Sequence, residues 1–195
     1  MKATGTVVAV AVGCLFSMAA NAQTAGSEVQ RDLNQQQRIE QGLKSGSLNT
    51  REASKLEGGE ARIDRMESNA MKDGKLSPAE KARIQRAQNQ ESRDINRLES
   101  NAAKGNPNSA SSQRMQADVQ RNVNQQQRIE QGVKSGQLTN REVGKLEGGQ
   151  ARVDRAEARA GANGHVGKRE QQGIQKAENQ QSKRIYRQKH DAQTR

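Results

Sequence analysis

The sequence predicts an all-α protein in which one three-helix unit occurs twice. The segment NQQQRIEQGLKSG at residues 34–46 returns as NQQQRIEQGVKSG at residues 124–136. The similarity continues without insertion from 29–101 onto 119–191, at a constant offset of about 90 residues. Apolar residues recur at spacings of three and four, and no stretch of useful length alternates as a strand does. These observations predict helices alone, arranged in the same way in both copies.

The two copies set the domain boundaries. We expect a first helical unit at residues 27–99 and a second, more basic unit at residues 119–191, followed by a short tail at residues 192–195. Residues 100–118 combine Gly, Pro, Ser and Asn with almost no apolar residue, which is typical of a flexible linker. The prediction is therefore two tandem units joined by that linker.

Residues 1–22 have the layout of a secretory signal peptide. A positive charge at Lys2 precedes a short apolar run, and the segment ends in Ala-Asn-Ala at residues 20–22. We expect cleavage after Ala22 and a periplasmic or secreted mature protein. The apolar run is too short for a membrane span, so none is expected in the mature chain. The alternative is a lipoprotein that is acylated at Cys14.

Composition limits how the mature chain can be stabilised. The formal net charge is +11. Lys and Arg exceed Asp and Glu by about 2 in the first copy and by about 7 in the second. The single cysteine lies in the predicted signal peptide, so no disulfide is expected afterwards. Because apolar residues are few, the helices should share a thin core, which leaves a homo-oligomer open.

Capping signals mark where the helices of each copy begin. Asn49 followed by Glu52 forms a capping box before the second helix, and Ser77-Pro-Ala-Glu80 forms a stronger one before the third. The second copy repeats the scheme but has Gly167 at the last of these starts, so that helix should begin less firmly.

The second helix of each copy contains a pair of glycines in its middle. The pair is Gly58-Gly59 in the first copy and Gly148-Gly149 in the second. Each glycine costs roughly 1 kcal/mol of helix stability relative to alanine. Its recurrence therefore predicts close helix packing or a bend at this point.

The same helix carries several carboxylates. In the first copy Glu57, Asp64 and Glu67 alternate with Arg62 and Arg65. Opposite charges three and four residues apart are typical of a solvated helix face with side-chain ion pairs. We therefore expect these carboxylates to face solvent.

Both turns of each copy share a pattern of glycine, any residue, an aliphatic residue, three further residues and glutamate. The four instances begin at glycines 46, 74, 136 and 164. The pattern resembles the second half of an EF-hand loop, in calmodulin-like helix-loop-helix pairs, where the last glutamate binds calcium. In the best loop the resemblance implies the ligands Asn69, Asp73, Ser77 and Glu80, and hence weak calcium binding.

The alternative for these turns requires no metal. The glycines would end helices and the glutamates would close capping boxes. The second copy favours this interpretation, because it keeps glycine and glutamate but has Asn163 in place of Asp73 and Arg159 in place of Asn69.

Basic residues gather in the second copy and suggest an electrostatic binding surface for a polyanion, a nucleic acid or an anionic membrane surface. One group shares a helix face and another lies near the C-terminus: Arg152, Arg155 and Arg159, with Lys183, Arg184, Arg187 and Lys189. The mature chain has Tyr186 as its only aromatic residue, so binding through base stacking is not expected.

No residue pattern indicates catalysis. The two histidines, His165 and His190, have no further metal ligand at suitable spacing, and no serine lies in a nucleophile motif. We expect a non-catalytic binding or scaffold protein without a cofactor, apart from weak calcium binding. Its partner would be an unidentified protein, an anionic polymer or an anionic surface.

Overall fold

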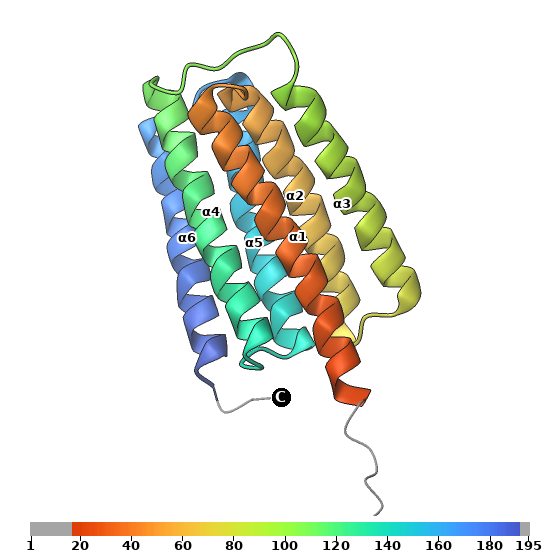
Figure 1. Cartoon of the computed structure of the whole chain (residues 1–195). Coiled ribbons are helices and arrows are strands. Elements are labelled where there is room, and N and C mark those ends of the chain that lie inside the picture. The colour runs from red at the N-terminus through yellow and green to blue at the C-terminus, as the bar shows by residue number, and fades with distance from the viewer. Residues whose placement is uncertain (1–16, 192–195) are drawn as a thin grey trace, which may run out of the picture.

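The structure, a computed structural model, describes residues 17–191, which form α-helices, short 3-10 helices and connecting turns without a strand (Figure 1). The prediction of an all-α protein is therefore confirmed for this part of the chain. The helices are α1 Ser17–Ser45, α2 Thr50–Ala70, η1 Met71–Asp73, α3 Pro78–Glu99, α4 Ala110–Lys134, α5 Asn140–Ala160, η2 Gly161–Asn163 and α6 Lys168–Lys189.

Three of the expectations fall wholly or mainly outside the described residues. The predicted signal peptide at residues 1–22 reaches them only through its last residues, which belong to α1, whereas Cys14 and the tail at residues 192–195 lie outside. Among the described helices, none has the length and apolar character that crossing a membrane requires.

The predicted capping signals begin the helices at the expected places. The Asn49 side chain accepts a hydrogen bond from the Glu52 amide at 3.0 Å, and the Glu52 carboxylate accepts one from the Asn49 amide at 3.1 Å. Ser77 and Glu80 form the same reciprocal pair at the start of α3. Gly167 has no side chain for this purpose, as the sequence indicates.

Helix α4 begins earlier than the predicted linker allows. Residues 110–118 belong to α4, and Ser109 caps the helix by accepting a hydrogen bond from the Ser112 amide at 3.1 Å. The irregular connection is therefore limited to residues 100–109. It contacts the first turn of the first copy, where the Gly105 amide donates to the Gly46 carbonyl at 2.9 Å.

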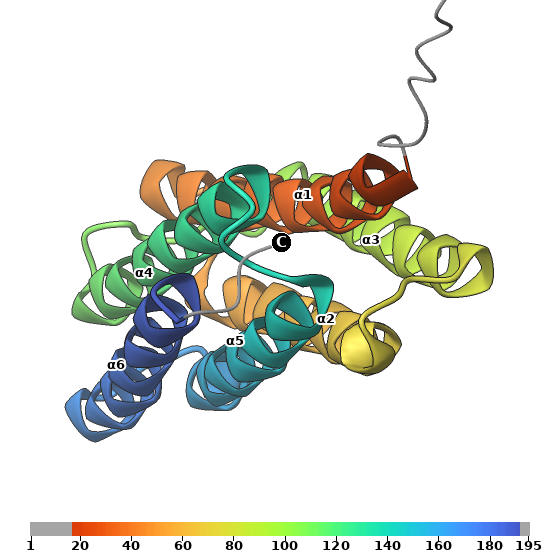
Figure 2. The same ribbon diagram turned by 90° about the horizontal axis from the view of Figure 1, so that it is seen from below.

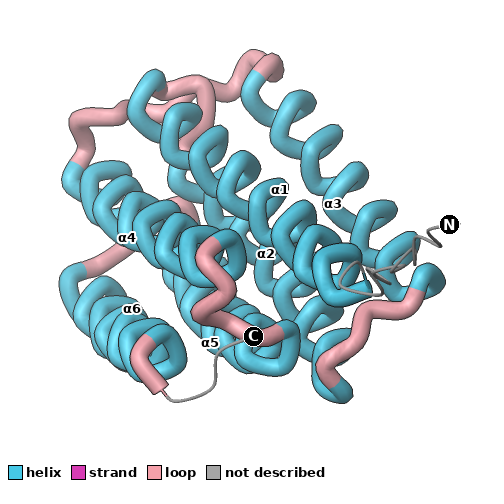
Figure 3. The backbone as a smooth tube through the Cα atoms, turned by 60° about the horizontal axis from the view of Figure 1, so that its bottom comes forward, coloured by secondary structure: helices cyan, strands magenta, loops and turns pink. Residues whose placement is uncertain are grey.

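The closest helix packing joins the two copies to each other. Helix α2 packs along α5, and α1 packs along α4, while α3 flanks α1 and α2, and α6 flanks α4 and α5 (Figure 2). Helices α2 and α5 run antiparallel, because Gly58 faces Ala158 and Gly148 faces Ser68. Helices α1 and α4 also run antiparallel, because Lys44 bonds to Gln120 near one end and Lys134 bonds to Gln30 near the other. The connections lie at the two ends of the bundle (Figure 3).

Two apolar clusters hold the ends of this bundle together, and each combines residues of both copies. The first cluster contains Ile39, Leu43, Leu48, Ala53, Leu56, Ile95, Leu98, Met115, Val119, Ala160, Val166 and Ile174. The second contains Ala25, Val29, Met71, Ile129, Val133, Leu138, Val143, Leu146 and Ile185. Helices α1, α4, α5 and α6 each contribute to both clusters near opposite ends, so the middle of the bundle must be filled by other side chains.

The glycine pairs make room where α2 and α5 meet their neighbours, which confirms the predicted close packing. A Cβ atom on Gly148 would lie 2.6 Å from Ser68 Oγ of the other copy. On Gly149 it would collide with the buried Gln181 side chain of α6, and on Gly59 with the Glu91 carboxylate of α3.

We expect Gly144→Ala to destabilise the fold, because Gly144 of α5 packs closely against Ser68 and Met71 of the first copy. The added Cβ would lie 2.8 Å from Met71 Cβ and 3.4 Å from the Ser68 carbonyl oxygen. Overpacking of this kind costs about 1–3 kcal/mol of unfolding free energy, which urea denaturation measures.

The matched control for this substitution is Gly58→Ala. Its new methyl would meet Ala158 Cβ at 3.6 Å, an ordinary contact, so the control should keep or gain stability. Equal stability of Gly144→Ala and the control would show that the two copies do not interlock at Met71.

Candidate metal centre

Carboxylates fill the middle of the bundle, contrary to the expectation that they face solvent. Glu57, Asp64 and Glu67 of α2 are 0–1% exposed, and so are their counterparts on α5. The prediction of a solvated face is wrong because this face of α2 lies against α5 and is covered by α1 and α4. The helical spacing is as predicted, but it directs these side chains inward.

Four of these carboxylates form a group that we name centre A. It consists of Asp32 from α1, Asp64 and Glu67 from α2, and Glu147 from α5, with one oxygen of each residue within 4.8 Å of all the others. Two ligands on opposite sides of one calcium-sized ion lie about 4.6–5.2 Å apart. The four oxygens are therefore close enough to share a single cation.

Amide groups hold the carboxylates of centre A in place. Gln88 Nε2 from α3 donates to Asp32 Oδ1 at 2.8 Å and to Glu67 Oε1 at 3.1 Å. Gln126 Nε2 from α4 donates to Glu147 Oε2 at 3.1 Å. Hydrogen bonds of this kind orient metal ligands in proteins, and here each uses one of the two carboxylate oxygens.

A second group, centre B, repeats the first at the offset of the two copies. It contains Glu57, Asp154 and Glu157 with ligand oxygens within 4.8 Å of one another. Asn122 takes the place that Asp32 has in centre A, and its Nδ2 donates to Asp154 at 3.2 Å and to Glu157 at 2.7 Å. Gln36 Nε2 donates to Glu57 Oε2 at 3.0 Å. Each centre is thus built from helices of both copies.

The remaining oxygens of these carboxylates are buried and, among the described residues, accept no hydrogen bond from an amide, hydroxyl or basic group; the carboxyls contact only one another there. These oxygens are Asp32 Oδ2, Glu57 Oε1, Asp64 Oδ2, Glu67 Oε2, Glu147 Oε1 and Glu157 Oε1. Glu60, which lies on α2 between the two centres in sequence, has neither of its oxygens partnered and is 1% exposed. None of the ion pairs within residues 17–191 involves a member of either centre.

Burial raises the pKa of every carboxyl in the two centres. It raises the pKa of Asp32 and of Glu57 to about 7 and the pKa of Glu147 to about 8. For Asp64 the raised pKa is caused first by loss of water and then by the charge of Asp154. The Asp64 and Asp154 carboxyls are hydrogen-bonded to each other, which connects the two centres.

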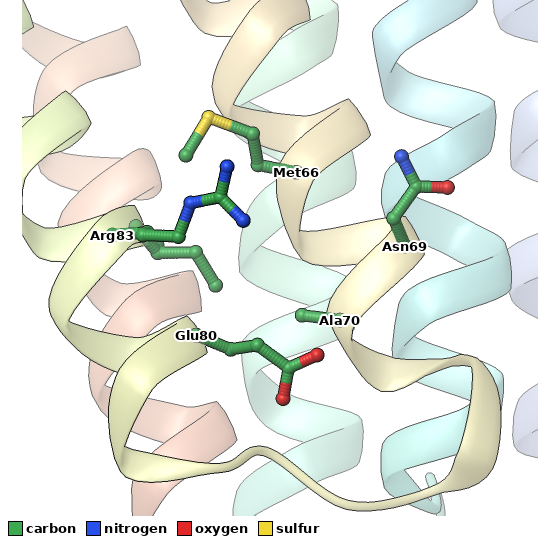
Figure 4. Close-up of a pocket in the computed structure, with 6 residues that line it drawn as sticks. Met66, Asn69, Ala70, Glu80 and Arg83 are labelled. Carbon is green, nitrogen blue, oxygen red and sulfur yellow. The ribbon is translucent and has the colours of Figure 1, made fainter.

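The turn residues that the EF-hand resemblance indicates do not converge with centre A or centre B, and they make local hydrogen bonds instead. Glu80 is half-buried, and its carboxylate accepts hydrogen bonds from the Ser77 amide at 3.0 Å and the Ser77 hydroxyl at 2.6 Å, which lower the pKa of Glu80. Asp73 accepts from the Lys75 amide at 2.9 Å. Asn69 and Glu80 line one hollow of about 220 Å³, but in Figure 4 the Asn69 amide points away from Glu80.

Three of the predicted polyanion-binding residues come together on the surface. Arg152 of α5 and Arg184 and Arg187 of α6 line a hollow of about 540 Å³, together with Lys145, which the sequence reasoning missed. Partial burial and the nearby Arg184 lower the pKa of Arg152. Lys183 lines a neighbouring hollow. Neither hollow is lined by the other three predicted residues, Arg155, Arg159 and Lys189.

Comparison with family models, with curated proteins and with solved structures finds no match for this chain. The sequence itself contains a signal for the two centres. Glu57, Glu60, Asp64 and Glu67 follow the spacing of an inward-facing helix stripe, and helix bundles build metal sites from carboxylates that project inward from facing helices.

We expect the metal-free protein to lose stability as pH rises from about 5 to about 8.5. The buried carboxyls hold protons up to pKa values near 7 and 8, whereas in the unfolded chain they ionise near their ordinary values. The folded state therefore binds more protons in this range, so raising the pH favours unfolding. Melting temperatures in the presence of a chelator measure this slope.

Basic groups around the centres moderate this dependence without removing it. Arg31 lies near Asp32, and Arg62 lies near Glu91, a buried carboxyl close to Glu57. Glu57→Gln combined with Glu147→Gln should flatten the slope, because an amide cannot ionise. A melting temperature that rises over the same range would show that these carboxyls are ionised in the folded protein.

Proposed function

We propose that the protein binds hard, multiply charged metal ions at centres A and B. The observation that carries the proposal is a layer of seven buried carboxylates, four in centre A and three in centre B, whose ligand oxygens converge within 4.8 Å. All the donors are oxygens, and neither centre contains histidine or cysteine. Such donor sets suit calcium, magnesium, manganese and similar hard ions rather than copper or zinc.

The energetics of burial support this proposal. Moving an ionised carboxylate out of water costs several kcal/mol unless a partner replaces the lost solvation. In centre A the glutamine amides supply one partner to Asp32, Glu67 and Glu147, and among the described residues no amide, hydroxyl or basic group reaches the second oxygen of each. The Asp32 and Glu67 carboxyls contact only each other there. A cation between these oxygens would be that partner. Purely structural acids would instead be expected to pair with Arg or Lys.

The position of the layer suggests what binding would do to the protein. Centre A draws ligands from α1, α2 and α5, and centre B from α2 and α5, so bound ions would cross-link the central helices between the two apolar clusters. Binding free energy at such a site adds to folding free energy. We therefore propose a non-catalytic metal-binding protein, with the predicted extracytoplasmic location retained as part of the proposal.

We expect calcium or manganese to raise the melting temperature of the chelator-treated protein. At an ion concentration about a hundredfold above Kd the gain should be about 5–10 °C. Asp64→Asn combined with Glu67→Gln should abolish the gain while the metal-free variant melts at the same temperature or higher, because like charges have been removed from the interior.

The control for this experiment is Asp73→Asn, which removes the acid of the EF-hand-like turn. It should leave the gain intact, because Asp73 is exposed and lies in the turn that follows α2. Loss of the gain in Asp73→Asn, with the gain retained in the core variant, would place the metal in the turn and contradict the proposal.

We propose a second, electrostatic function for the hollow between α5 and α6, where a specific difference between the copies favours it. The first-copy counterpart of Arg184 is Asp94, which pairs with Arg97 at 2.8 Å. In the second copy Lys145, Arg152 and Arg184 surround the hollow, and no acidic residue lines it. Phosphate or sulfate groups of a polyanion would offset these charges without any sequence preference.

We expect Arg152→Gln combined with Arg184→Gln to weaken retention on a heparin column. The salt dependence of binding should become shallower by about one unit for each charge that contacts the polymer. The control is Arg83→Gln combined with Arg86→Gln, which removes the same net charge from exposed positions of the first copy. Equal loss in both variants would mean that net charge alone, and not this hollow, holds the polymer.

A further inference from the structure

The two metal centres lie side by side and share the same helices. Asp64 of centre A and Asp154 of centre B are hydrogen-bonded to each other across the α2–α5 contact. The two centres also exchange one glutamate each. Glu57 of centre B comes from α2, which supplies Asp64 and Glu67 to centre A, and Glu147 of centre A comes from α5, which supplies the other two ligands of centre B. An ion in one centre would therefore act electrostatically on an ion in the other.

The number of carboxylates suggests the charge of the ions. The two centres hold seven carboxylates, and Glu60 lies beside them without a partner. When these eight carboxylates are ionised, two divalent ions leave four of their negative charges uncompensated, whereas two trivalent ions leave two. Because an uncompensated buried charge is strongly destabilising, the trivalent state is the better balanced of the two.

The two copies also differ in a way that should rank the centres. Asn122 in centre B occupies the place of Asp32 in centre A, and Gln150 occupies the place of Glu60. Gln150 Nε2 donates to Asn122 Oδ1 at 3.3 Å, so the amide oxygen of Asn122 is already engaged. Affinity for hard cations rises with the number of charged ligands, which makes centre A the stronger site.

Resting on the proposed function, we infer that centres A and B form one paired site that prefers trivalent hard cations, of lanthanide or ferric type, over divalent ones and fills centre A first. The oxygen-only donor set and the shared helices determine the class of ion and the pairing. The unpartnered Glu60 carboxyl lies next to both centres and would add one more negative charge when a bound cation favours its ionisation.

Competition titrations of the full chelator-treated chain test this preference. La³⁺ and Ca²⁺ are added separately, at constant pH, in the presence of a chelator of known affinity, and binding is followed by calorimetry. We expect two La³⁺ per chain, with affinity above that for Ca²⁺ by about a hundredfold or more. Tight Ca²⁺ binding without a La³⁺ advantage overturns this inference alone. Failure of both ions to bind overturns the proposed function as well.

Luminescence of bound Tb³⁺ reports where the ion lies. Decay rates in H₂O and D₂O give the number of water molecules on the ion, and a buried site should leave far fewer than an exposed turn. Retention of most of the hydration shell would assign the ion to the turns and overturn the inference. Displacement of Tb³⁺ by La³⁺ or by the smaller Ga³⁺ supports the trivalent class, and the more effective ion identifies its size.

Two reciprocal substitutions test the order of filling. Asp32→Asn makes centre A resemble centre B, and it should weaken the first Tb³⁺ binding step about tenfold or more. Asn122→Asp gives centre B a fourth carboxylate, and it should strengthen the second step. Asp73→Asn is the control and should change neither. If Asp32→Asn weakens only the second step, centre A does not fill first.

Discussion

The buried layer of carboxylates between two apolar clusters is the constraint on which the rest of the structure depends. The clusters lie toward opposite ends of the central helices, and the layer fills the space between them. Acidic side chains are ordinarily exposed, because exposure keeps their carboxylates in water. This chain instead buries them where the cost is greatest, and it surrounds them with glutamine and asparagine amides rather than with arginine or lysine.

Duplication and antiparallel packing together convert one acidic helix into two centres. Helix α2 carries Glu57 near its start and Asp64 with Glu67 near its end, and α5 carries the same pattern. When the two helices run antiparallel, the start of each meets the end of the other. Glu147 therefore completes the group of Asp64 and Glu67, and Glu57 completes its counterpart. A single copy could not form either centre.

The sequence was sufficient for the local features and insufficient for the interior. The capping boxes of Asn49 and Ser77 involve residues a few positions apart, so pattern and structure agree. The direction of the acidic stripe depends on which helix covers it, and a stripe of acids flanked by Arg62 and Arg65 has the same spacing whether it is solvated or buried. The predicted end of the linker at residue 118 was wrong for a similar reason. Residues 110–118 form the start of α4, and several of their small and polar side chains are buried.

The same layer explains how a thin core can coexist with extensive burial of charge. Without an ion, protons held by carboxyls such as Asp32 and Glu147 reduce the repulsion, because burial raises their pKa values to about 7 and 8. In the proposed metal-bound state a cation would take over that role and would link helices through their carboxylates. Protons and metal ions would then compete for the same oxygens. The amide side chains would serve both states, because they hold one oxygen of every carboxylate in the two centres except Asp64, which contacts Asp154 instead.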